Sequence, residues 1–153
     1  MSKQTLQKIL KSDAGLAALV VRMPVGLILA SHGAQKLFGW FGGYGLEGTG
    51  QWMASIGLEP GYLMALLAGS AEFFGGLALI LGLFTRPAAA LSAFTMLVAI
   101  FSVHFEHGLF ISNNGYEFAL ALLAATAGLV IQGAGSYSID SALAKKVLGE
   151  TSV

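Results

Sequence analysis

The stretch AGLAALVVRMPVGLILASHGAQKLF, residues 14–38, decides the fold class, because it is an apolar run long enough to cross a bilayer. A helix rises about 1.5 Å per residue, so roughly 20 apolar residues span the hydrocarbon core of a membrane. Similar runs follow at about residues 62–84, 87–107 and 116–133, the last at the short end of the range. The sequence therefore predicts an all-α membrane protein, a single-domain bundle of four transmembrane helices over residues 1–153.

Composition supports the membrane class and excludes several functions. Apolar residues make up 56% of the chain and charged residues only 10%, whereas about 25% of a soluble domain is charged. The formal net charge is zero and no run of Lys and Arg exceeds a pair, so the basic surface that nucleic-acid binding requires is missing. The chain has no cysteine, so thiol–disulfide chemistry and iron–sulfur ligation would need a partner protein.

The positions of lysine and arginine predict the orientation. On one side of the predicted spans lie Lys3, Lys8, Lys11, Arg86, Lys145 and Lys146. On the other side only Lys36 is basic, and its long side chain at a helix end is expected to snorkel toward the interface. The positive-inside rule places both termini in the cytoplasm, which predicts a multi-pass protein of the cytoplasmic (inner) membrane.

Segments outside the spans, and one face of the second span, carry further predictions. Residues 39–61 are rich in glycine and aromatic residues and are expected to fold over the outer end of the bundle, with Thr49 capping a short helix. Residues 138–149 are expected to form a short surface helix with Asp140 as its N-cap. A stripe of small residues in the second span predicts close packing against another helix: Ala68, Ala71, Gly75, Ala78 and Gly82.

Ionisable residues inside the predicted spans form the candidate site. A charge within a bilayer is costly, so such residues are usually paired or face a cavity. Helical periodicity places them along a polar track from the outer mouth to the middle of the bundle: Arg22, His32, Glu72, His104 and Glu117. Arg22 and Glu72 lie at similar depths and are predicted to form an ion pair, as a structural element or as the floor of a binding site. The remaining three lie near the outer face and are expected to form one ligand site.

Other interpretations of these residues remain open at the level of sequence. The two histidines within the spans could hydrogen-bond carbonyl groups between helices, and Glu117 could cap its own helix. His104 and His107 are spaced to share a metal ion with His32 or Glu117. Two histidines across a bundle could also bind haem. Neither metal arrangement has a specific sequence signature.

Short motifs run along nearly the whole chain: HGAQKLFGWFGG at 32–43, AEFFGG at 71–76, GLFTR at 82–86, GLF at 108–110, GYEF at 115–118 and GAGSYSID at 133–140. In this order they resemble the motifs of the DoxX family of small bacterial membrane proteins. The resemblance implies a four-span bundle associated with redox chemistry, such as a quinone-linked oxidoreductase or a membrane complex that resists oxidative stress. The matching motif positions are Arg22, His32, Gln35, Lys36, Glu72, His104 and Glu117, whereas His107 stands where asparagine is expected.

The residues and the resemblance together predict a redox-associated protein of the cytoplasmic membrane. It is expected to bind a quinone or a similar small lipophilic molecule in an outward-facing polar pocket, within a complex that supplies the electrons. Its role would be that of an oxidoreductase subunit or of an anchor for a soluble redox enzyme. No metal is expected, haem is less favoured than quinone, and an oligomer is compatible with the sequence. A lipid or small-solute carrier without redox chemistry and a purely structural anchor are the alternatives. The predicted binding residues are Arg22, His32, Lys36, Glu72, His104 and Glu117.

Overall fold

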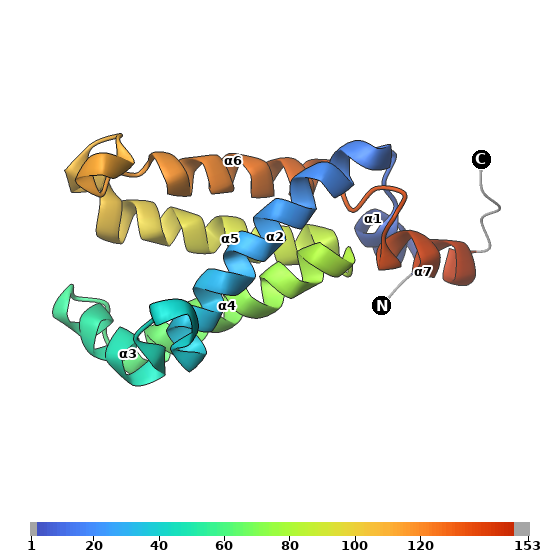
Figure 1. Cartoon of the computed structure of the whole chain (residues 1–153). Helices are drawn as coiled ribbons and strands as arrows, with labels where there is room; N and C mark the ends of the chain where they lie inside the picture. The colour runs from blue at the N-terminus through green and yellow to red at the C-terminus, as the bar shows by residue number, and fades with distance from the viewer. Residues whose placement is uncertain (1–2, 149–153) are drawn as a thin grey trace.

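The computed structural model describes residues 3–148, which form helices and no strands. The long helices are α2 (Gly15–Phe38), α4 (Gly61–Leu81), α5 (Thr85–Ala99) and α6 (Glu117–Gln132) (Figure 1). A π-helical turn (Ile100–His104) and a 3-10 turn (Phe105–His107) extend α5. The short elements are α1 (Lys3–Leu10), α3 (Gly45–Ser55), α7 (Ile139–Leu148) and 3-10 turns at Trp40–Gly42 and Ile111–Asn113.

Three helical segments of the described chain are long and apolar enough to cross a membrane, namely Gly15–Phe38, Gly61–Leu81 and Thr85–His107. The fourth predicted span corresponds to α6, an apolar helix of 16 residues, which is shorter than the roughly 20 residues that a span usually needs. The C-terminal helix expected over residues 138–149 is found as α7, and Gly149 lies outside the described residues. The helical class of the prediction is therefore confirmed.

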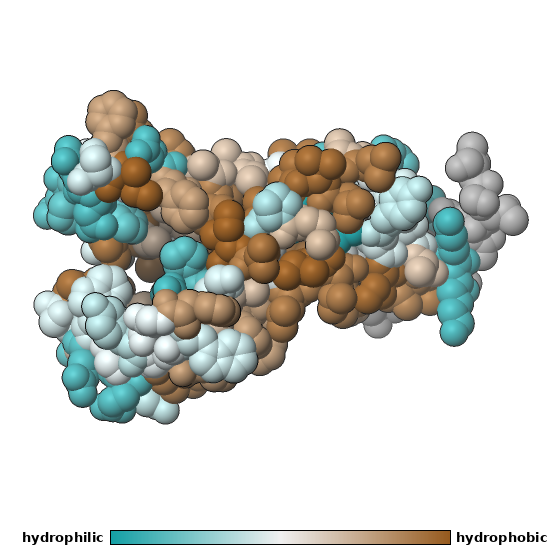
Figure 2. All heavy atoms as spheres, in the orientation of Figure 1, coloured by the Kyte–Doolittle hydropathy of each residue, from teal (hydrophilic) through white to brown (hydrophobic). Residues whose placement is uncertain are grey.

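The long helices are arranged as two pairs. α2 packs mainly on α4, and α5 packs mainly on α6. The pairs converge at the end of the bundle that carries α1 and α7, which we call the terminal end, and separate at the opposite end, the open end (Figure 1). The space-filling view shows a hollow at the open end, between the region of residues 105–116 and the region of α3 (Figure 2). Buried apolar residues shared by the helices join the pairs: Ala18, Val25, Leu29, Leu79, Ala89, Met96, Ile100, Ala119, Leu122 and Leu129.

Glycines bring α2 and α4 into close contact. A side chain on Gly76 would begin 2.4 Å from the backbone nitrogen of Ala30, and one on Gly33 would begin 2.3 Å from that of Phe73. The predicted close packing of small residues therefore occurs, but it uses a different face of α4. Of the predicted stripe, Ala68, Ala71 and Gly75 line a cavity between α4 and α5, and α5 approaches closely at Gly75, where a side chain would begin 2.9 Å from the hydroxyl of Ser92. The spacing of small residues does not specify which helix will face them.

At the terminal end of the bundle, Arg22 and Arg86 each donate hydrogen bonds to the last backbone carbonyls of a helix. Arg22 is 1% exposed, and it donates to the carbonyls of Leu79 and Ile80 in the last turn of α4 and to those of Ala134 and Tyr137 after α6. Arg86 donates in the same way to the last carbonyls of α6 and to the carbonyl of Lys11. Cations are favoured at helix C-termini, where carbonyls are left without intrahelical partners. The terminal end is thus fastened by two arginines.

Asp140 caps a different helix from the one predicted. Its carboxylate accepts hydrogen bonds from the backbone nitrogens of Phe84 and Thr85, at 2.7 and 2.8 Å, and so caps the start of α5. The start of α7 is capped by Ser138, whose hydroxyl accepts from the nitrogen of Ser141. The prediction that Asp140 caps its own helix is wrong, because a side chain in the first turn of α7 is close enough to reach the neighbouring turn.

The glycine-rich region after α2 contains α3, which packs on α4 at the open end. α3 begins at Gly45, so Thr49 is a buried residue within the helix and the prediction that it caps this helix is wrong. α3 lies very close to the start of α4, since a side chain on Gly61 would begin 2.1 Å from the carbonyl oxygen of Gly50. This contact positions α3 and its loop beside the end of α2.

Candidate functional site

Lys36 and Glu72 form an ion pair between α2 and α4 near the open end, with the ammonium nitrogen 2.5 Å from the carboxylate oxygen. Lys36 lies in the last turn of α2 and Glu72 near the middle of α4. Only 5% of the Glu72 side chain and 22% of the Lys36 side chain are exposed. Gly69 makes the pairing possible, because a side chain there would meet Leu37 at 2.8 Å and Lys36 at 3.2 Å.

The predicted pair of Arg22 with Glu72 is wrong. Glu72 binds Lys36, and Arg22 donates to backbone carbonyls at the terminal end. Fourteen residues separate Arg22 from Lys36 in one helix, which is about 21 Å of rise, and the glycine contacts set α4 so that Glu72 faces the Lys36 end. Lys36 consequently does not snorkel to the surface as predicted.

A cavity of about 450 Å³ lies beside this ion pair, enclosed by the end of α2, the following loop and α3. Lys36 and Gln35 contribute polar groups to it, and Tyr44 and Trp52 contribute aromatic rings. The loop approaches α2 closely at Gly43, where a side chain would begin 2.4 Å from the carbonyl oxygen of Gln35. The remaining lining residues are Gly42, Gly43, Gly48 and Thr49.

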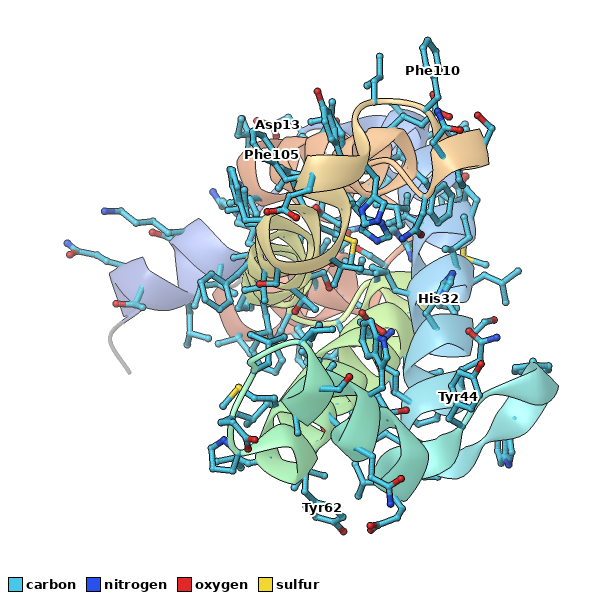
Figure 3. All side chains as sticks on the ribbon, turned by 90° about the vertical axis from the view of Figure 1, so that its left-hand side faces the viewer. Asp13, His32, Tyr44, Tyr62, Phe105 and Phe110 are labelled. Carbon is cyan, nitrogen blue, oxygen red and sulfur yellow. The ribbon has the colours of Figure 1, made fainter. Side chains whose placement is uncertain are left out.

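His32 lies one turn before Lys36 on α2 and connects this region with α6. Its imidazole ring is 6.2 Å from the ring of Phe118, at an angle of 49°. Figure 3 looks onto the open end and shows His32 between the region that carries Phe105 and Phe110 and the region that carries Tyr44. The His32 side chain is exposed and lies beside Phe118 of α6.

His104 fastens the loop that follows α5. It ends the π-helical turn, and its Nδ1 lies 2.8 Å from the carbonyl oxygen of Asn114. A carbonyl only accepts, so Nδ1 donates, and a neutral His104 ring then has Nε2 as an acceptor. The π-turn shifts the register of α5, and π-turns are frequent at functional sites. His107, expected one turn further along, is exposed.

Glu117 holds the other side of the same loop. Its Oε1 accepts a hydrogen bond from the backbone nitrogen of Ile111, at 2.6 Å. Backbone bonds from Tyr116 to Gly108 and from Glu117 to Leu109 close the loop. His104 and Glu117 therefore position the loop of residues 105–116, which forms one wall of the open end.

The six predicted site residues thus fall into three groups. Lys36 and Glu72 are paired, with His32 one turn away from them on α2. His104 and Glu117 order the loop on the opposite side of the hollow. Arg22 belongs to the terminal end and not to this region. Over residues 3–148, no group of three His, Asp or Glu side chains could hold a metal ion.

Of the residues that line the cavity, only Lys36 was predicted from sequence as ligand-binding, and the side chains of Gln35, Tyr44, Thr49 and Trp52 were not. The aromatic residues of this segment are expected from composition to be interfacial, because tyrosine and tryptophan are enriched at membrane surfaces. The available signal was the glycine content of residues 39–61, which predicts a loop that approaches other backbone closely. That signal places the loop over the outer end but does not identify its inward-facing side chains.

The helical bundle, its apolar spans and its paired charges define a small membrane protein with a polar pocket at one end. Residues 17–105 match the sequence profile of the DoxX family, and the chain belongs to this family of membrane proteins. The predicted family resemblance is confirmed.

Several bacterial proteins are similar to the chain over most of its length. It is 36% identical to "Inner membrane protein YqjF" of Escherichia coli (strain K12), covering 88% of this chain and 95% of YqjF. It is 33% identical to "Putative oxidoreductase CatD" of Bacillus subtilis (strain 168), covering 70% of this chain and 73% of CatD. It is 32% identical to "Inner membrane protein YphA" of E. coli (strain K12), covering 80% of this chain and 86% of YphA. No solved structure matches the chain.

Proposed function

We propose that this protein binds a quinone or a similar small lipophilic molecule at the open end of the bundle, as a subunit of an oxidoreductase complex or an anchor for a redox enzyme in the cytoplasmic membrane. The observation that carries the proposal is the Lys36–Glu72 ion pair beside a partly polar cavity. Buried ionisable groups in membrane helices are expensive and are commonly functional. The names of CatD, YqjF and YphA support the redox role and the inner-membrane location.

The cavity has the size and chemistry for an aromatic or quinonoid ring. Small-molecule sites usually have about 300–1,000 Å³, and this one has about 450 Å³. Tyr44 and Trp52 offer ring faces for offset stacking. Lys36 and Gln35 supply N–H groups that can donate to a carbonyl oxygen. The lining residues therefore fit a flat ring that carries hydrogen-bond acceptors.

The chain's own groups can bind the ring and supply protons. A quinone, when bound, accepts two electrons and two protons. Lys36 holds protons at the cavity, and Glu72 keeps the ammonium in place. His32, one turn away on an exposed face, can exchange protons with water in the hollow. Electrons must come from a partner, because this cysteine-free chain has no group of its own that carries them.

Binding can be tested with tryptophan fluorescence, because the chain has two tryptophans and only Trp52 lines the cavity. In nanodiscs, a short-chain ubiquinone is expected to quench the Trp40→Phe variant, which reports on Trp52, along a saturable curve. The Lys36→Met/Glu72→Met double variant in this background should bind about tenfold or more weakly, because it lacks the charged groups. His107→Gln changes an exposed residue outside the cavity and should bind normally.

The matched control is Trp52→Phe, which leaves Trp40 as the reporter. Trp40 is 56% exposed and does not line the cavity, so a quinone that merely partitions into lipid should quench it along a straight line. Equal and linear quenching of both tryptophans would contradict the proposed binding site.

We also propose four spans with both termini in the cytoplasm, so that the open end faces outward. The support is the basic side of the chain and the apolar character of α6. A membrane-impermeant thiol reagent on intact cells is expected to label Gln51→Cys and Asn113→Cys but not Lys8→Cys or Lys145→Cys, all of which are exposed positions. Three spans would place positions 113 and 145 on the same side, so labelling both or neither of them would refute the fourth span.

A further inference from the structure

Thr49 is a buried polar residue at the cavity of about 450 Å³ beside the Lys36–Glu72 ion pair, which we call the polar cavity. It lies within α3, is 6% exposed and lines this cavity. Trp52, three residues further along α3, also lines it, as expected for two residues on one face of a helix. With these two side chains α3 forms one wall of the polar cavity.

The Thr49 hydroxyl has no hydrogen-bond partner within residues 3–148. Other hydroxyls in the long helices behave differently, since Ser31, Thr95 and Thr126 each donate to the carbonyl four residues earlier. That bond is the usual solution for a hydroxyl in a helix. A largely buried hydroxyl without a partner is unfavourable, so Thr49 holds an unused hydrogen-bonding group.

This hydroxyl can be reached from the polar cavity. Thr85 and Ser92 also have hydroxyls without partners, but those two oxygens are sealed inside the protein. The Thr49 oxygen is not sealed, although its residue is almost fully buried. Because Thr49 lines the polar cavity, the accessible surface of its oxygen lies there. A molecule in the cavity can therefore hydrogen-bond Thr49.

The polar cavity has hydrogen-bonding groups on a second wall. Lys36 and Gln35 line it from the last turn of α2, whereas Thr49 lines it from α3. An ammonium only donates hydrogen bonds, whereas a hydroxyl both donates and accepts. The rings of Tyr44 and Trp52 lie at the same cavity. A flat ring bound here would meet polar groups from two different helices.

We infer that the ligand of the polar cavity is a ring with two oxygens, one bound by Lys36 of α2 and the other by the Thr49 hydroxyl of α3. This inference rests on the proposed binding of a quinone or similar molecule in this cavity, and it narrows the ligand to rings with two oxygens. The hydroxyl can donate to a quinone carbonyl and accept from the O–H of the reduced ring. Thr49 is thus a specificity-determining residue that suits both oxidation states.

Tryptophan quenching in nanodiscs, with the Trp40→Phe variant as background, tests the role of Thr49. Thr49→Val keeps the shape of the side chain but removes the hydroxyl, and should weaken binding of a short-chain ubiquinone about fivefold, the value of one hydrogen bond. Thr49→Ser keeps the hydroxyl and should bind nearly normally. Without quinone, Thr49→Val should unfold at the same or a higher temperature, because the lost hydroxyl had no partner. Thr126→Val removes a buried hydroxyl outside the cavity and should leave binding unchanged.

Two competitors of the ubiquinone test the second oxygen. They are 2-hexyl-1,4-naphthoquinone and 2-hexyl-1-tetralone, which have similar bicyclic rings with two oxygens and one. Thr49→Val should weaken the naphthoquinone about fivefold and the tetralone less than about twofold. Equal weakening of both competitors, unchanged ubiquinone binding in Thr49→Val, or a lower unfolding temperature of this variant without quinone would overturn the inference. Absence of saturable ubiquinone binding in the background variant itself would instead contradict the proposed function.

Discussion

Replacing Arg22 with methionine is expected to lower the free energy of unfolding by about 4 kcal/mol or more. The guanidinium is almost fully buried and donates to four carbonyls, two at the end of α4 and two in the connection that follows α6. Methionine fills similar space but donates nothing, so these carbonyls would lose a charged partner in a site that water does not reach. Thermal unfolding in nanodiscs, or the folded fraction after heating in detergent, measures the effect.

Two variants separate geometry from charge in this prediction. Arg22→Lys keeps the charge but cannot present the planar fork to carbonyls on several sides, so it should recover only part of the loss. Lys8→Met removes an exposed charge on α1 and should change stability by less than about 0.5 kcal/mol. If Arg22→Met unfolds at the same temperature as Lys8→Met, the hydrogen bonds of Arg22 do not stabilise the terminal end.

Lys36→Met alone, or Glu72→Met alone, is expected to cost about 3–5 kcal/mol, because each leaves a buried charge without its partner. The double variant should regain much of that loss, since two apolar side chains can pack where a buried ion pair stood. A double-mutant cycle on unfolding free energies measures the coupling between the two residues.

The same cycle with Arg22 in place of Lys36 is the matched control. Arg22 and Glu72 have no common partner in the structure, so the effects of Arg22→Met and Glu72→Met should add within about 0.5 kcal/mol. Additive effects for Lys36 and Glu72 would show that these two residues do not form an ion pair. Strong coupling between Arg22 and Glu72 would show that Glu72 interacts with Arg22 instead.

The sequence by itself determined the helical segments and the membrane class of this protein. Apolar runs of roughly 20 residues with few charges are unfavourable in water. In lipid they form helices, because a helix hydrogen-bonds all of its backbone N–H and C=O groups internally. The predicted runs at 14–38 and 62–84 correspond to α2 and α4 within a few residues at each end. The short motifs, found in their order along nearly the whole chain, also identified the family.

The tertiary structure alone decided which polar residues meet. Depth along each helix was predictable from a rise of about 1.5 Å per residue, and on that basis Arg22 was as good a partner for Glu72 as Lys36. The choice depends on where α2 crosses α4, which Gly33, Gly69 and Gly76 set by allowing backbone contact at one register.

The same reason explains Asp140, which caps α5 across 55 residues of sequence instead of its own helix. Periodicity states which face of a helix a side chain occupies. It does not state which neighbouring backbone will lie opposite that face, because helix packing in a membrane depends on shape matching between segments that are far apart in the chain.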